Sequence, residues 1–138
     1  MKVREAMSRP AISLKADVPA KVAAALLVSH GYTAAPVVDE TERVVGIATE
    51  ADLVRGRIVP DGWAVEEQQE PTVRDVMTEA PVVAAAGDDL ADVVATMLDR
   101  GIRSVPVADA GRLVGVLTRR DVLRLVAHGT LRSRGASA

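Results

Sequence analysis

The sequence predicts an α+β fold made of two similar halves related by a pseudo-twofold axis. The first observation is an internal repeat: residues 3–53 resemble residues 73–122, with an offset of 70 that falls to 69 after the turns at Asp39 and Asp109. The second is that each copy alternates helix-like and strand-like patterns. A repeat of this length is not a solenoid unit that needs several neighbours. Two such halves would leave a cleft between them, and ligand sites are common between packed units.

Composition sets the class of protein. The chain has 138 residues, about one domain, and 49% of them are hydrophobic. One Trp, one Tyr and no Phe imply an aliphatic core. A net charge of −2 argues against a nucleic-acid partner held by its phosphates, and the lack of Cys excludes disulfides and thiolate metal sites. No signal peptide is visible and the longest apolar run, residues 22–28, is too short to span a membrane. We therefore expect a soluble cytoplasmic protein with no membrane partner.

Each copy begins with a short helix followed by a short extended segment. A proline near each extended segment biases the residue before it toward an extended conformation. The predicted helices are residues 3–7 and 73–77, and the predicted extended segments are residues 11–14 and 81–84.

A longer helix comes next in each copy. In the first copy Asp17 is the expected N-cap, Pro19 lies near the first turn, and the helix runs to about His30. Gly31 and Gly101 are expected to end the two long helices as C-caps. Helical spacing in the second copy is carried by Leu90, Val93, Val94, Met97 and Leu98.

Two apolar runs joined by a polar turn then predict a β-hairpin in each copy. The runs are residues 35–38 and 44–48 in the first copy and residues 105–108 and 113–117 in the second. A further helix begins at Thr49 or Thr118 and, in the second copy, runs to about Ala127. We expect repeats at residues 1–59 and 72–127, a linker at residues 60–71 in which Trp63 covers the core, and a flexible tail at residues 128–138.

A search for catalytic residues finds almost nothing. The sequence contains no HExxH motif and no phosphate-loop glycine signature, and no Cys/His or Ser/His/Asp pattern is evident. His30 and His128 each precede a glycine at a predicted helix end, where a histidine interacts with the last carbonyls. The sequence therefore predicts neither an enzyme nor a metal site.

The repeated Thr-x-x-Asp pattern, Thr49 to Asp52 and Thr118 to Asp121, is the remaining candidate site. One reading is structural: Thr at the N-cap and an acidic residue three positions later form an arrangement like a capping box. The other is functional, because a helix N-terminus attracts an anion and a carboxylate accepts hydrogen bonds from a vicinal diol such as that of ribose. The two readings are compatible, and the pattern alone leaves both open.

The order of the motifs resembles that of the CBS (cystathionine beta-synthase) domain. Each copy has Met-[Ser/Thr], then Gly-x-x-x-x-Pro-Val-x-Asp, then Gly-[Ile/Val]-x-Thr-x-x-Asp-[Leu/Val]. The tandem copies resemble a CBS pair, or Bateman module, over about Met1–Val126. With no further domain evident, the resemblance implies a stand-alone CBS-pair protein.

The resemblance also implies a fold and a function. Each repeat would form a small three-stranded sheet with two helices, and the repeats would pack sheet to sheet, leaving two clefts. Such clefts commonly bind adenosyl ligands: AMP, ADP, ATP, S-adenosylmethionine or cyclic di-AMP. The chain would then be a regulatory module, not an enzyme and with no required cofactor, that forms a homodimer and signals to an effector protein. The alternative is a ligand-free scaffold for protein interactions.

Specific residues follow from the resemblance. The ribose-binding Asp corresponds to Asp52 and Asp121, and the Thr of the motif to Thr49 and Thr118. The base-facing segments and the residues lining the base pocket are Tyr32, Thr33, Ala34 and Ile12 in the first repeat and Ile102, Arg103, Ser104 and Val82 in the second.

The two sites differ in charge. Arg119 and Arg120 lie inside the second motif and Arg103 is close by on the preceding strand, so three guanidiniums favour a di- or triphosphate there. Glu50 in the first motif would repel phosphate. We therefore expect the Asp121 site to be the preferred nucleotide site, and the first site to be empty or to hold a less charged ligand. In the alternative reading, the arginines are ordinary solvated helix residues.

Overall fold

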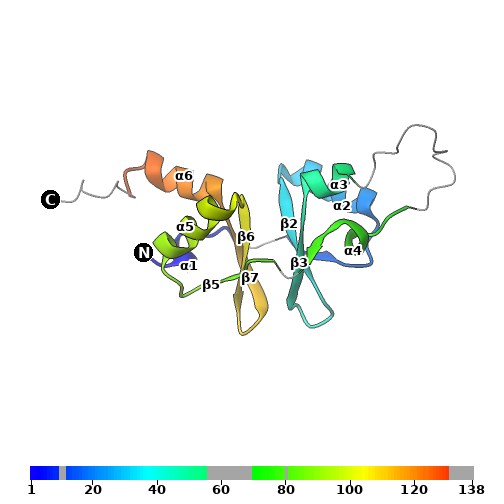
Figure 1. Cartoon of the computed structure of the whole chain (residues 1–138), viewed down its shortest axis with the longest axis horizontal. Helices are drawn as coiled ribbons and strands as arrows, with labels where there is room; N and C mark the ends of the chain where they lie inside the picture. Colours follow the sequence, from blue (N-terminus) through cyan, green and yellow to red (C-terminus); the bar gives the residue numbers. More distant parts are fainter. Residues whose placement is uncertain (10–11, 56–69, 80, 131–138) are drawn as a thin grey trace. The chain divides into compact units, whose positions relative to one another are not determined.

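A computed structural model of the chain describes residues 1–9, 12–55, 70–79 and 81–130 (Figure 1). These residues form six helices and two small sheets, so the predicted α+β class is confirmed. They divide into two compact units. Unit 1 contains residues 1–9, 82–110 and 114–130, and unit 2 contains residues 12–55, 70–79, 81 and 111–113.

Unit 2 is built on a sheet with the strand order β1-β2-β3-β4. Strand β1 runs parallel to β2, with Leu14 opposite Val37, and the other pairs are antiparallel. The strands are β1 (Leu14–Lys15), β2 (Ala34–Val38), β3 (Val44–Thr49) and β4 (Thr78–Glu79), and the helices are α2 (Ala20–His30), α3 (Glu50–Arg55) and α4 (Val73–Val76). The predicted hairpin is therefore present, and β4 adds a strand that the sequence did not predict.

Unit 1 repeats this plan with a sheet in the order β5-β6-β7. Strand β5 is parallel to β6, and Ala84 lies opposite Val107, the same pairing as in unit 2 moved by 70 residues. In place of a fourth strand, Ser8 forms a single antiparallel bridge with Val116. The elements are β5 (Ala84–Ala85), β6 (Ser104–Asp109), β7 (Arg112–Thr118), α1 (Val3–Ala6), α5 (Leu90–Arg100) and α6 (Arg119–Ala127).

The short helices pack with the repeat that they do not precede. Figure 1 shows α1, the blue helix at the start of the chain, beside α5, and α4 with α2 and α3. The amide of Val3 donates to the carbonyl of Asp88 at 2.9 Å, and the amide of Val73 donates to that of Val18 at 2.8 Å. The sequence repeats and the packing units thus divide the chain differently. The repeat bounds 1–59 and 72–127 stay a prediction about sequence similarity.

Each unit has its own aliphatic core, as the composition predicts. The short helices are part of these cores, because Val3 and Val73 are completely buried. Burying such a side chain contributes about 1.5–3 kcal/mol. The largest core residues are Val3, Leu90, Met97, Val105, Val107 and Leu117 in unit 1 and Leu14, Leu27, Val37, Leu53 and Val73 in unit 2.

Both long helices end where the sequence predicts, but α2 does not begin as predicted. Gly31 and Gly101 are left-handed C-caps with φ of 70° and 66°, as predicted. The prediction of Asp17 as the N-cap of α2 is wrong, because Pro19 occupies that position. The amide of Ala20 instead donates to the carbonyl of Pro71 at 2.8 Å, so the segment before α4 satisfies the start of α2.

Some predicted features lie outside the described residues. They include most of the linker, with Trp63, and most of the tail. Within the ranges that the structure does describe, no helix has both the length and the apolar character needed to cross a membrane.

Candidate functional site

The second Thr-x-x-Asp motif lies where β7 ends and α6 begins. Thr118 is the N-cap of α6, and its Oγ1 accepts a hydrogen bond from the Asp121 amide at 3.1 Å. In return, Oδ2 of Asp121 accepts from the Thr118 amide at 2.9 Å. The structural reading of the motif as a capping box is therefore confirmed. The exchange also fixes the Asp121 carboxylate at the start of the helix, where the dipole favours negative charge.

The other carboxylate oxygen of Asp121 has two partners from within unit 1. Oδ1 accepts from the Ser8 hydroxyl at 2.8 Å and from the Arg124 guanidinium at 3.1 Å. Asp121 itself is only 5% exposed, so these contacts compensate the charge of a buried carboxylate. Sequence reasoning missed Ser8 and Arg124. A signal existed for Arg124, since an arginine follows each motif Asp by three residues, whereas the Met-[Ser/Thr] motif marks Ser8 as part of the repeat but not as a partner of Asp121.

The first motif has the same box in unit 2. The Thr49 amide donates to Oδ2 of Asp52 at 2.9 Å, and the Asp52 amide donates to Oγ1 of Thr49 at 3.1 Å. Asp52 is buried, and its Oδ1 is paired with the Arg55 guanidinium. Thr78 stands where Ser8 stands in the other repeat. Among the described residues of unit 2, however, no hydrogen bond links Thr78 to Asp52.

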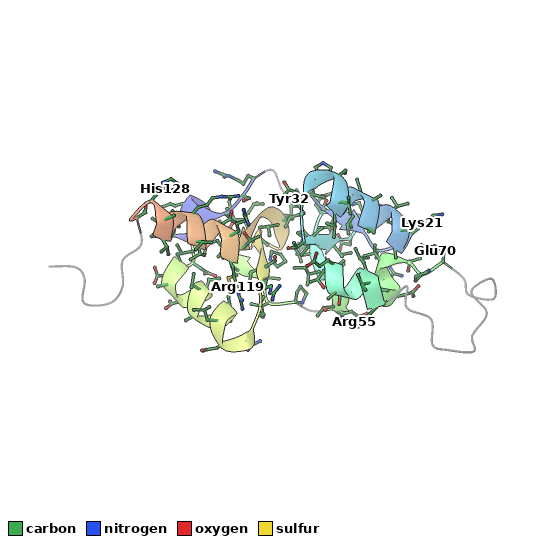
Figure 2. The ribbon with its side chains drawn as sticks, turned by 90° about the horizontal axis from the view of Figure 1, so that it is seen from above. Lys21, Tyr32, Arg55, Glu70, Arg119 and His128 are labelled. Carbon is green, nitrogen blue, oxygen red and sulfur yellow. The ribbon has the colours of Figure 1, made fainter. Side chains whose placement is uncertain are left out.

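The predicted base-facing residues of the second repeat lie beside its motif. The carbonyl of Arg103 accepts from the Arg119 amide at 3.0 Å, and that of Ile102 accepts from Arg119 Nε at 3.3 Å. Ser104 is buried at the start of β6. Figure 2 shows Arg119 at the beginning of α6 and His128 at its end. The structure thus brings the start of β6 and the start of α6 together.

The first repeat has the corresponding arrangement with different side chains. The carbonyl of Thr33 accepts from the Glu50 amide at 2.8 Å, next to Ala34 at the start of β2. Tyr32 is 44% exposed and stacks on His30, with ring centroids 5.8 Å apart and an angle of 21° between the planes. The aromatic ring of Tyr32 is therefore already paired with another ring.

The two residues predicted to line the base pocket are half-buried. Ile12 packs against the core of unit 2 and Val82 against the core of unit 1. Val82 also lines a hollow of about 330 Å³ beside the first turn of α5. A larger cavity of about 640 Å³ in unit 2 is lined by Lys15, Asp39, Arg74 and Glu79 among others, and by none of the predicted site residues.

Charge distinguishes the two motifs, as the sequence predicts. Around Asp121, the side chains of Arg103, Arg119 and Arg120 are all exposed. Those of Arg103 and Arg120 make no hydrogen bond or ion pair with any residue in the described ranges, so they are available to an anion. Exposed Glu50 takes the corresponding place near Asp52.

Each motif is equipped separately for binding by hydrogen bonds and charge. In unit 1, one carboxylate at a helix start, backbone carbonyls and exposed guanidiniums suit a polar ligand that carries both hydroxyl donors and a negative group. In the described part of the chain, no three His, Cys, Asp or Glu side chains are grouped so that they could hold a metal ion.

Known proteins resemble this chain over most of its length. The sequence profile of the CBS domain matches residues 3–58 and 73–128. The uncharacterised protein MJ1225 of Methanocaldococcus jannaschii is 31% identical over 124 residues, which are 90% of this chain and 42% of that protein. The chain thus spans less than half of this relative's length.

Solved structures share the fold. The CBS domain pair of protein MJ0100, in complex with 5′-methylthioadenosine and S-adenosyl-L-methionine, superposes with a TM-score of 0.80 at 28% identity. CBSX2 in complex with AMP gives a TM-score of 0.81 at 28% identity. In each case the match covers 94% of this chain and 98% of the other. The predicted pair of repeats is therefore confirmed.

Proposed function

Because the chain belongs to the CBS domain family, we propose that it is a regulatory module that binds an adenosine-containing ligand, with the Asp121 site preferred. The observation that carries this proposal is the buried Asp121 carboxylate, fixed at the start of α6 beside exposed arginines. Related structures with adenosyl ligands, at 28% identity, support the choice of ligand class. We propose that the module binds this ligand and catalyses no reaction on it.

The roles of the residues follow from their positions. The Asp121 carboxylate accepts hydrogen bonds from the ribose hydroxyls, and the start of β6, residues 102–104, faces the base. Arg120 and Arg103 then neutralise phosphate, together with the positive end of the α6 dipole. The first site has the same carboxylate in Asp52 but carries Glu50 instead of an arginine, so a neutral adenosyl ligand suits it better.

Regulation requires that the ligand distinguish two states of the protein. We place these states in a homodimer that rearranges on binding and passes the change to an effector protein. Support for a second copy comes from apolar side chains that unit 1 leaves exposed on α5 and α6, namely Leu98, Leu123 and Val126, which are 54–63% exposed. Sedimentation with and without ligand tests this part of the proposal.

The test of binding is calorimetric titration with AMP, ADP, ATP, S-adenosylmethionine and 5′-methylthioadenosine, together with thermal unfolding. A ligand specific for the folded state adds about 2.7 kcal/mol of stability at a hundredfold excess over its Kd. The variant to compare is Asp121→Asn. Its amide oxygen can still accept the hydrogen bond from the Thr118 amide, while the negative charge is lost. We expect it to weaken binding by roughly tenfold to a hundredfold, as hydrogen bonds to a charged group are worth about 1.5–3 kcal/mol.

A ligand-free scaffold is the second candidate, favoured by one observation. Both oxygens of Asp121 already have protein partners, so the motif is complete as a structural cap. On this reading Asp121→Asn lowers stability and no adenosyl compound binds. Equal affinity of the wild type and Asp121→Asn for an adenosyl ligand would remove the proposed site, and no binding at all would favour the scaffold.

A further inference from the structure

We propose that Ser8 is an intramolecular competitor for Asp121: its hydroxyl occupies an acceptor position that a ribose diol needs and leaves when the diol binds. The inference rests on the proposed adenosine-ligand function and goes further by naming what limits it. Ser8 lies on the N-terminal segment, 113 residues from Asp121 in the sequence. The binding carboxylate of the second repeat is thereby linked to the start of the chain.

The Asp121 carboxylate has a limited number of acceptor positions. Each of its two oxygens accepts two hydrogen bonds. Oδ1 of Asp121 is filled by Ser8 and Arg124, and Oδ2 has the Thr118 amide. Within the described structure one position is therefore left. A vicinal diol that donates from both hydroxyls needs two, so one present donor must leave.

Ser8 is the donor that leaves. Arg124 carries a charge opposite to that of the carboxylate, and charge-assisted pairs of this kind are the stronger ones. The Ser8 donor is a neutral hydroxyl that turns away by rotation about a single side-chain bond. The Thr118 amide is fixed by the start of α6.

The backbone keeps Ser8 in place whether or not its hydroxyl is bound. The Ser8 amide donates to the Val116 carbonyl at 2.9 Å, and the Val116 amide donates to the Ser8 carbonyl at 3.2 Å. Gly115 permits this close approach, because a Cβ there would lie 2.7 Å from Met7 Sδ and 3.0 Å from the Ser8 carbonyl oxygen. Releasing the hydroxyl therefore costs one hydrogen bond and no change of the main chain.

The first repeat provides the matched comparison. Thr78 approaches β3 in the same way, since a Cβ on Gly46 would lie 2.9 Å from its carbonyl oxygen. Yet Oδ1 of Asp52 is bound by Arg55 alone among the described side chains. Two acceptor positions are therefore open at Asp52, and a diol displaces nothing there. Competition by a hydroxyl is a property of the Asp121 site.

The experiment measures binding at one site with two probes. In an Asp52→Asn background, which isolates the Asp121 site, AMP and 2′-deoxyadenosine 5′-monophosphate are titrated calorimetrically into the Ser8 protein and into Ser8→Ala. We expect Ser8→Ala to tighten AMP binding by about threefold to tenfold, the value of one modest hydrogen bond. The deoxy compound needs only the open position, so its affinity should change by less than about twofold. Thr78→Ala is the control and should leave both values unchanged.

Three results would overturn the inference. Unchanged AMP affinity in Ser8→Ala would mean that no competition exists, and weaker affinity would make Ser8 a ligand contact. An equal gain in affinity for AMP and the deoxy compound would show that the effect of Ser8→Ala does not depend on the ribose diol. If AMP binds neither the Ser8 protein nor Ser8→Ala, the competition inference fails for AMP, whereas the proposed function fails only if none of the five adenosyl compounds titrated above binds.

Discussion

The hydroxyl of Ser8 donates a 2.8 Å hydrogen bond to the carboxylate of Asp121, across 113 residues of sequence. Nearby, the amide of Val3 is bonded to the carbonyl of Asp88, so the N-terminal segment is part of unit 1 and not of the repeat that it precedes. The second repeat's candidate site is therefore completed by the start of the chain. Substitution of Ser8 is therefore expected to change ligand binding at Asp121 and not at Asp52.

Thr118 gives the first prediction. Thr118→Ala removes the oxygen that accepts from the Asp121 amide at the start of α6. Loss of an N-cap side chain costs about 0.5–2 kcal/mol, so the free energy of unfolding in urea should fall by that amount. Thr118→Ser keeps the hydroxyl and should remain close to the wild type. Equal losses for the two variants would show that the methyl group, and not the cap, matters.

Gly115 gives the second prediction, on the packing of the N-terminal segment. In Gly115→Ala, the new Cβ would lie 2.7 Å from Met7 Sδ and 3.0 Å from the Ser8 carbonyl oxygen. The methionine can move, but the backbone carbonyl is bonded to Val116 and must shift. Overpacking of this kind costs about 1–3 kcal/mol, measurable by urea unfolding.

The control for Gly115 is its counterpart in the other repeat. Gly46→Ala meets Met77 Sδ at 2.7 Å and the Thr78 carbonyl oxygen at 2.9 Å, so a similar loss is expected. Only Gly115→Ala should also move Ser8 and so change AMP binding at Asp121. Wild-type stability in both variants would contradict the close approach.

Local patterns predicted much of the fold. The strands of both hairpins and the helix ends at Gly31 and Gly101 agree with the sequence to within one or two residues, because apolar runs, polar turns and C-cap glycines are local signals that extend over a few positions. Distant contacts decided the rest. The sequence pattern around Asp17 favours an N-cap, yet the carbonyl of Pro71 satisfies the Ala20 amide. Nothing local shows that two residues, Thr78–Glu79, add a strand to β3.

The candidate site was predictable to a similar extent. The spacing of Thr118 and Asp121 is enough to predict the cap, since both residues belong to one helix turn. Arg124 lies three residues further along the same helix and could have been found by helical spacing. Ser8 could not be found in that way, because no local rule joins it to a residue 113 positions away. The ligand roles of the predicted residues stay a prediction.

Asp39 gives a prediction about pH. Hydrogen bonds from the Thr41 side chain and from the amides of Arg43 and Thr41 lower the pKa of the Asp39 carboxyl below its ordinary value of 3.8. A group whose pKa is lower in the folded chain stabilises the fold above the unfolded pKa and loses that contribution as the pH falls through the folded pKa. Wild type should therefore exceed Asp39→Asn in urea midpoint at neutral pH, with a difference that shrinks below about pH 4. A difference in urea midpoint that stays constant from neutral pH to below about pH 4 would contradict a stabilising role of the Asp39 charge.

Arg120 gives the last prediction, on the anionic part of the ligand. Its exposed guanidinium has no hydrogen-bond or ion-pair partner among the described residues, while Arg119 Nε is already bonded to the Ile102 carbonyl. If Arg120 meets phosphate, Arg120→Ala should weaken ATP binding by roughly threefold to tenfold and leave adenosine unchanged, because a charged pair near the surface is worth about 1 kcal/mol. Added salt should reduce the gap between the two proteins. Arg74→Ala, an exposed arginine of unit 2, is the matched control. Equal losses for adenosine and ATP would assign Arg120 to the fold of α6 and remove phosphate from its role.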